Sequence, residues 1–89
     1  MRNIIKLERI IKGLANRRRL AILRYTASEK EAIVNDIAGE IRLSIKATSK
    51  HLNILIHCDI LEREQRSRFM FYRLNRELHP LVKCILSIV

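Results

Sequence analysis

The sequence has little of what several classes of protein depend on. Its only cysteines, Cys58 and Cys84, form no CxxC motif, so neither a disulfide framework nor a cysteine zinc site is predicted. No apolar run approaches the roughly 18 residues needed to cross a bilayer. Lys6, Glu8 and Arg9 interrupt the apolar residues near the N-terminus, so we expect no secretory leader. These absences favour a reduced, cytoplasmic protein without a membrane partner.

Acidic residues are scarce relative to basic ones. Nine Asp and Glu accompany eighteen Lys and Arg, a formal net charge of +9, which suggests a polyanionic partner, either nucleic acid or an anionic membrane surface. Hydrophobic residues make up 48% of the 89 residues, enough for one domain, residues 1–89, with a modest core. There is no Gly-rich phosphate loop and no triad spacing of Ser, His and acid. We therefore predict no enzyme activity.

The stretch Leu43–Leu61 predicts a helix with two unlike faces. One face is apolar at spacings of three and four, and consists of Ile45, Thr48, Leu52, Leu55 and Ile56. The other face is polar or cationic, and consists of Lys46, Ser49, Lys50, Asn53 and His57. Ser44 precedes the helix and is a suitable N-cap. Such a polar front suits the DNA major groove, although an ordinary solvated helix face would show the same pattern.

Apolar periodicity predicts further helices over residues 3–14, 16–27, 31–41 and 76–89, and strands over 60–65 and 69–74. Arg42–Leu43 joins the third and fourth helices closely, so these two form a helix-turn-helix. The strands form a hairpin whose tip carries Arg66 and Arg68. Such a tip suits a wing that reaches backbone phosphates, and a solvated turn is the alternative. Asn16 and Asn75 are candidate caps of the second and last helices.

The terminal helices and the second helix carry two further signals. Helices 3–14 and 76–89 are apolar over more of their surface than packing on their own core requires, so we expect a homodimer formed through them. Arg17, Arg18 and Arg19 lie in the first turn of helix 16–27, where cations oppose the helix dipole. Phosphate contacts would offset that cost, and a solvated run is the alternative.

Three runs resemble a known family. Leu14–Leu23 is similar to L-A-D-P-x-R-L-x-I-L, with Asn16 and Arg17 in place of the usual Asp and Pro. Ser44–Leu55 is similar to S-x-x-x-V-S-x-H-L-x-x-L, and Phe69–Leu74 to a strand that ends in Y-x-L. In this order and spacing, the runs resemble the ArsR family of winged-helix transcriptional repressors.

The resemblance implies a mainly α fold with a small β-hairpin, a winged helix-turn-helix of order α-α-α-α-β-β-α that dimerises through its terminal helices. It also implies double-stranded DNA as a partner. The residues it implies as DNA contacts are Ser44, Lys46, Ala47 and Lys50 at base edges, Ser49 and His51 for backbone contact and helix positioning, and Arg66 and Arg68 at the wing tip. From the polar helix face and the arginine run we add Asn53 and Arg19. His51 lies beside Leu52, so a structural histidine remains an alternative.

The sequence lacks the family's metal sites. The cysteine-pair site has the form E-L-C-V-C-D-L, but Glu31–Ile37 lacks both cysteines. Glu77 and His79 resemble half of a second site, and two ligands are too few for zinc. We therefore predict no metal and no cofactor. Cys58 and Cys84 as a redox pair is an alternative, although free cysteine is commonly a small buried hydrophobe.

Taken together, the sequence predicts a sequence-specific DNA-binding transcriptional regulator, expected to repress. The rivals are a winged-helix protein–protein module, a non-specific DNA-binding protein and a basic membrane-surface protein. The last is disfavoured because the basic residues spread over several elements rather than one helix face. A steep salt dependence of DNA binding would argue against the protein–protein module.

Overall fold

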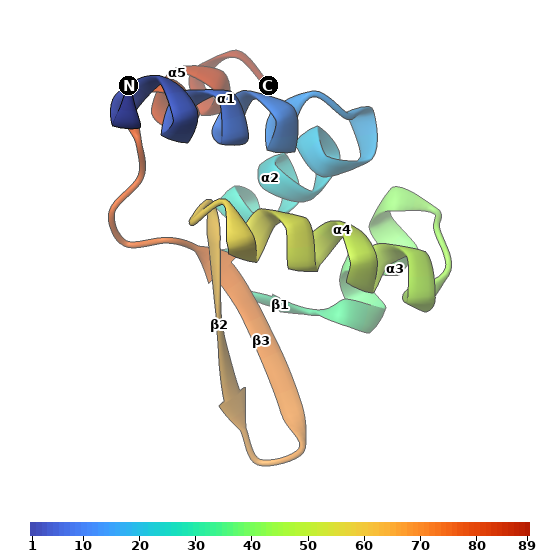
Figure 1. The fold of residues 1–89 in the computed structure, drawn as a ribbon. Coiled ribbons are helices and arrows are strands. Elements are labelled where there is room, and N and C mark those ends of the chain that lie inside the picture. Colours follow the sequence, from blue (N-terminus) through green and yellow to red (C-terminus); the bar gives the residue numbers. More distant parts are fainter.

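The computed structural model describes residues 1–89. The elements in chain order are α1 (Arg2–Leu14), α2 (Arg17–Glu29), β1 (Ala32–Ile33), α3 (Val34–Ile41), α4 (Ile45–His57), β2 (Leu61–Arg66), β3 (Phe69–Leu74) and α5 (Pro80–Ile88). In Figure 1, α1 and α5 lie together at the end that holds both termini, α4 crosses the middle, and β2 and β3 project from the other end as a wing. This order confirms the predicted winged helix-turn-helix, with one additional strand.

The additional strand, β1, corrects the predicted start of the third helix. Ala32 pairs with Tyr72 and Ile33 with Phe71, so β1 joins the free edge of β3 in an antiparallel sheet of order β1-β3-β2. The helix therefore begins at Val34 rather than at residue 31. Pairing with β1 satisfies backbone groups that β3 would otherwise leave open along that edge. A strand of two residues is too short to show alternation in a sequence.

The core lies where α2, α3 and α4 meet the sheet. Its fully buried side chains are Ile22, Leu23, Ile37, Leu52, Leu55, Ile60, Leu61 and Val82. Thr26 is also buried, and its hydroxyl donates to the carbonyls of Ile22 at 2.9 Å and Leu23 at 3.1 Å. That bonding within its own helix satisfies the hydroxyl in apolar surroundings. The helix-turn-helix and the wing therefore share one core that fixes their relative position.

The last helix is shorter than predicted. It begins at Pro80 rather than at residue 76, and His79 caps it: His79 Nδ1 accepts a hydrogen bond from the amide of Leu81 at 3.0 Å. Asn75 was therefore the wrong cap. Proline restricts the residue before it to extended conformations and favours the first helical position, where its missing amide matters least.

A close approach joins α1 to the C-terminal end of α4. A Cβ atom built on Gly13 would lie 2.8 Å from Cys58 Sγ, so a larger residue would require either the Cys58 side chain or α1 to shift. Cys58 Sγ also lies 3.5 Å from the carbonyl oxygen of Arg9, to which it donates. Burial raises the pKa of the Cys58 thiol, which keeps it protonated and able to donate.

The opposite face of α1 is open to solvent. Ile4 is 65% exposed and Ile11 is 49% exposed. Ile11 also lines an entirely apolar surface cavity of about 270 Å³ together with Leu81 and Ile85 of α5. The terminal helices thus present a continuous apolar surface. None of the helices combines the length and the apolar character that a membrane span requires.

Candidate nucleic-acid interface

The helix-turn-helix presents α4 with its N-terminus free. Arg42 ends α3 in the left-handed conformation, with φ at 54°, and so replaces the glycine that often occupies such a turn. Two residues later, Ser44 Oγ accepts a hydrogen bond from the amide of Ala47 at 3.1 Å. The predicted N-cap is therefore confirmed. Thr48, Leu52 and Leu55 are fully buried beneath the helix and hold it against the core.

The outward face of α4 is mostly polar. Lys46, Lys50 and Asn53 are exposed, and neither lysine lies within ion-pair distance of a carboxylate. Ala47 and Ser49 are partly exposed beside them. The ammonium groups of Lys46 and Lys50 are therefore available to an external anion.

Ile45 was wrongly predicted to be buried with the apolar face of this helix. Its spacing from the buried residues predicted an inward side chain, but it is 51% exposed. Ile45 is the first residue of α4, and at this position no core residue packs over the helix. A periodicity argument treats a helix as covered along its whole length, and here the first turn extends beyond the core.

Arg19 and His51 form a structural link between α1, α2 and α4. The Arg19 guanidinium donates to the carbonyls of Gly13 at 2.6 Å and Lys12 at 3.2 Å, and its Nη1 lies 3.1 Å from His51 Nδ1. Because a guanidinium only donates, His51 Nδ1 must accept and the neutral ring carries its proton on Nε2. Burial lowers the pKa of His51, and the charges of Arg19 and Arg18 lower it further.

The three consecutive arginines have three different environments. Asn16 caps α2, and its Oδ1 accepts from the amides of Arg18 at 2.9 Å and Arg19 at 3.1 Å. The Arg18 guanidinium donates to the carbonyl of Arg42 at 3.4 Å, at the turn before α4. Arg17 is exposed and forms no side-chain hydrogen bond or ion pair. Arg19, which the sequence predicted to contact DNA, is thus already engaged by α1 and α4.

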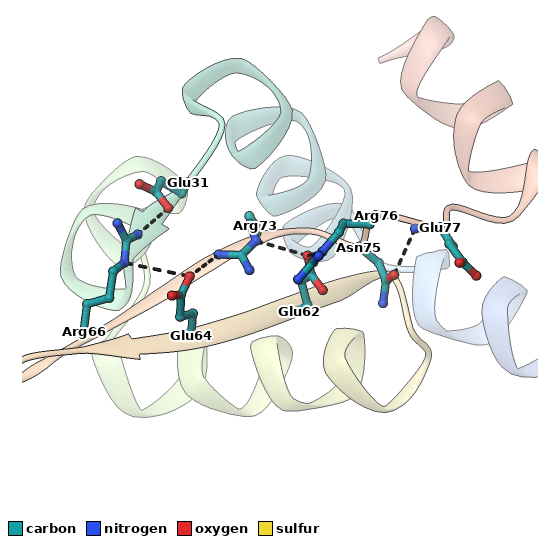
Figure 2. A network of polar contacts seen from close by, with 8 residues as sticks. All are labelled: Glu31, Glu62, Glu64, Arg66, Arg73, Asn75, Arg76 and Glu77. Atoms are coloured by element: carbon teal, nitrogen blue, oxygen red, sulfur yellow. Dashed lines mark hydrogen bonds and ion pairs between the residues drawn. The ribbon is translucent and has the colours of Figure 1, made fainter.

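One face of the wing carries a balanced network of charges. Figure 2 shows it running from the end of α2 along β2 and β3. Three carboxylates face three guanidinium groups, and its members are Glu31, Glu62, Glu64, Arg66, Arg73 and Arg76. The closest contacts of Arg73 are 2.7 Å to Glu64 and 3.0 Å to Glu62. Hydrogen bonding from Arg73 is the main cause that lowers the pKa of the Glu64 carboxyl.

The two arginines of the wing tip differ. Arg66 pairs with Glu31, lies 3.9 Å from Glu64 and stacks over the ring of Phe71 at 3.8 Å. Arg68 forms no ion pair, is exposed, and lies 5.8 Å from the centroid of the Phe69 ring. Of the pair predicted at the tip, Arg68 alone keeps its charge uncompensated by a neighbour.

Sequence reasoning missed Arg63. The sheet register places Arg63 opposite Tyr72, and alternation places it on the same face of β2 as the buried Leu61. It is exposed and forms no ion pair. Its side chain therefore lies on the opposite face of the wing from the charge network. The signal was available in the alternation of residues 61–65, but it required the inward position of Leu61 to be known first.

No family model matches the chain, and no curated protein matches it; solved structures do. Reduced HlyU from Vibrio cholerae is 28% identical with a TM-score of 0.82, over 98% of this chain and 87% of that one. The homodimeric winged helix-turn-helix DNA-binding domain of Mb0332 from Mycobacterium bovis, a possible ArsR-family regulator, is 26% identical with a TM-score of 0.83, over 96% and 76%. The AntR antimony-specific transcriptional repressor is 28% identical with a TM-score of 0.73, over 88% and 68%.

The chain is a winged helix-turn-helix protein. Its structural neighbours are transcriptional regulators, and one of them is described as a possible member of the family that the sequence resembles. The agreement spans nearly the whole chain, so it includes the terminal helices and the wing as well as the helix-turn-helix.

The residues considered for a sensor site are dispersed in this winged helix-turn-helix protein. Glu77 and His79 both precede α5, and the His79 ring nitrogen that accepts from Leu81 serves as a helix cap. Cys58 is buried against α1, whereas Cys84 is exposed on α5. No group of three or more His, Cys, Asp or Glu side chains is arranged to hold a metal ion.

Proposed function

We propose that the protein is a homodimeric regulator of transcription that binds duplex DNA sequence-specifically through α4. One observation carries the proposal: α4, capped by Ser44, presents Lys46 and Lys50 to solvent without intramolecular partners, while its inner face is fully buried in the core. The net charge of +9 and the transcriptional regulators among its structural neighbours support it.

The mechanism follows from which groups are free. Helix α4 enters the major groove, where Lys46 and Lys50 donate to guanine O6 and N7 or to phosphates. Asn53 offers an amide to base edges on the same face. Arg68 and Arg63 grip flanking phosphates, which fix register without reading sequence. Arg19 and Arg66, by contrast, are engaged by other groups of the protein, Arg19 beside α4 and Arg66 on the surface of the wing.

The second subunit would pack on the apolar surface of α1 and α5. The apolar pattern of the sequence places the interface over residues 3–14 and 76–89, and the exposed Ile4 and Ile11 with the apolar cavity beside α5 support that location. The Mb0332 domain is homodimeric. A two-fold axis would set the recognition helices about 34 Å apart, on a pseudo-palindromic site. Occupying that site would block polymerase and repress, in the cytoplasm and without catalysis.

Dimerisation is tested separately from DNA binding. Ile11→Glu places a charge in the centre of the apolar surface and should convert a dimer to a monomer in sedimentation equilibrium. Asn35→Glu introduces the same group at an exposed polar position of α3, outside the proposed interface, and should leave the mass unchanged. A wild-type protein that sediments as a monomer at micromolar concentration would contradict the proposed assembly.

The first experiment is a selection of random duplex DNA on the purified protein at near-physiological salt. An enriched palindrome with half-sites about one helical turn apart is the expected result. DNA binding that enriches no sequence and disappears as salt rises would indicate a non-specific DNA-binding protein. Absence of binding even at low salt would leave the winged-helix protein–protein module.

A further inference from the structure

Ten large hydrophobic side chains of the protein are exposed, and most of them have an explanation. Seven belong to the terminal helices and chain ends, where the proposed dimer would cover them. The remaining three lie on the helix-turn-helix and the wing, and are Ile45, Ile54 and Phe69. Phe69 lies below the guanidinium of Arg68. The two isoleucines of α4 have no such neighbour, so neither the dimer nor a cation explains their exposure.

Ile45 and Ile54 occupy opposite sides of α4. Nine residues at 100° each place their side chains about 180° apart around the helix axis. Ile45 is the first helical residue, between Ser44 and Lys46, and one turn before Ser49. Ile54 lies in the third turn. In helix-turn-helix proteins the N-terminal residues of the recognition helix reach the base edges, so Ile45 occupies the position that enters the groove first.

The chemistry of the first turn restricts what Ile45 can contact. The Ser44 hydroxyl accepts from the amide of Ala47, and Ala47 has only a methyl side chain and is partly exposed, so Ile45 and Lys46 are the long, exposed side chains of that turn. Lys46 can donate to guanine or phosphate oxygens. Ile45 has no polar atom in its side chain, and the thymine C5-methyl is the one methyl group that unmodified bases present in the major groove.

We propose that Ile45 is a specificity-determining residue that packs on the C5-methyl group of one thymine in each half-site. This inference rests on the proposed function, and it adds an apolar component to readout by Lys46 and Lys50. It requires the half-site to contain a thymine next to the position that Lys46 contacts. The side chain is 51% exposed in the free protein, so contact with a methyl group would remove apolar surface of both partners from water.

The experiment replaces each thymine of the selected site, one at a time, by deoxyuridine, which keeps base pairing and lacks only the methyl group. Removing one buried methyl corresponds to about a fourfold loss of affinity. The wild type should lose about fourfold at one thymine per half-site. Ile45→Ala should bind the unmodified site more weakly and be insensitive to deoxyuridine there. Ala is a better helix former than Ile, so circular dichroism should show an intact fold.

Ile54→Ala is the matched control, with the same truncation on the same helix, and should keep the wild-type sensitivity to deoxyuridine. A second measurement places 5-methylcytosine in a site where that thymine is changed to cytosine, and the added methyl should restore part of the wild-type affinity. Equal deoxyuridine effects on wild type and Ile45→Ala, or no effect on either, would overturn the inference while leaving DNA binding intact. Failure of the wild type to select any sequence would instead contradict the proposed function.

Discussion

The outward face of α4 and the wing both carry cations, but those cations differ in what they are free to do. Lys46 and Lys50 of α4 are exposed and have no carboxylate partner. In the wing, Arg66 and Arg73 are paired with glutamates, and Arg66 also stacks on Phe71. One region offers its charge to a partner, whereas the other neutralises most of its charge within its own sheet.

This difference shows that the net charge of a sequence gives the number of excess cations but not which of them are unpaired in the fold. Glu62, Glu64 and Arg66 alternate along β2, so they share one face of the wing. Across the ladder Glu62 faces Arg73, and opposite charges on directly paired strands attract. A basic hairpin in the sequence is therefore nearly neutral on one face in the fold, and Arg63 and Arg68 remain its free cations.

The largest effect is expected when the free charge of α4 is removed. Lys46→Ala with Lys50→Ala should lower affinity for the selected site by one to two orders of magnitude, because two contacts near the lower end of the range of about 1–3 kcal/mol per base contact sum to about 2 kcal/mol. Affinity for unrelated DNA should fall by much less. Fluorescence anisotropy titrations on both DNAs measure the difference.

Lys12→Ala is the control for that pair, since Lys12 is exposed on α1 and lies 3.8 Å from Glu8. It should leave both affinities nearly unchanged. Equal losses on selected and unrelated DNA in the α4 variant would assign both lysines to phosphates and remove base readout from this face.

The next largest effect is expected from Arg19, which is bound by other groups of the protein, and it should appear as a lower free energy of unfolding. Arg19→Ala leaves the carbonyls of Lys12 and Gly13 and the Nδ1 atom of His51 without their donor. A buried group that loses its partner typically costs about 1–3 kcal/mol; these contacts are part-buried or exposed, so the free energy of unfolding in urea should fall by about 1 kcal/mol at a fixed protein concentration. Arg17→Ala, with no such contacts, should change it by less than about 0.5 kcal/mol.

The same two variants separate structural from DNA-binding roles. If Arg19 contacted phosphate, as its place in the sequence suggested, Arg19→Ala would keep its stability and show a shallower dependence of affinity on salt. That outcome would contradict the assignment of Arg19 to the link between α1 and α4.

Sequence alone predicted the elements whose signals are local. The capping residues Ser44 and Asn16 and the two wing strands follow from residue types and periodicity. Asn75 failed as a cap because Pro80 fixes the start of the last helix. Strand β1 was missed because its two residues gain their structure from pairing with β3, which is a contact distant in sequence.

The residues of the candidate site also separate into those with a local sequence signal and those that depend on distant contacts. Residues on the outward face of α4 were predicted because helical spacing defines a face. The engagement of Arg19 depends on carbonyls at the end of α1 and a histidine 32 residues away. The pairing of Arg66 depends on Glu31, 35 residues distant. No spacing rule connects such residues, so their roles became visible only in the folded chain.

A smaller effect should distinguish the two arginines of the wing tip. Arg68→Ala should reduce the slope of log K against log salt by about 0.9 for each phosphate that Arg68 neutralises in the wild type. Arg66→Ala should leave that slope unchanged and alter stability by no more than about 1 kcal/mol, as exposed ion pairs do. Each slope is obtained from affinities measured at several salt concentrations. A larger change of slope for Arg66→Ala would show that its glutamate contacts open when DNA binds.

The smallest effect is the pH dependence that His51 contributes. In the folded protein its pKa is lowered by burial and then by Arg19 and Arg18, whereas in the unfolded chain it titrates near about 6.5. Below that pH, His51 in the unfolded chain binds a proton more readily than His51 in the folded protein. The free energy of unfolding therefore falls as the pH drops. Above about 6.5 this contribution is fully present.

Urea unfolding of wild type and His51→Gln between pH 8 and pH 5 measures the effect, and the wild type should lose more stability than the variant on acidification. His57→Gln is the control, because His57 is exposed and its Nδ1 lies 2.7 Å from the carbonyl oxygen of Asn53 in its own helix; it should follow the wild type. Protonation of His51 also removes the acceptor for Arg19, so the same titration tests whether the α1–α4 link depends on a neutral imidazole. Identical pH profiles for wild type and His51→Gln would show that the link tolerates the charged ring.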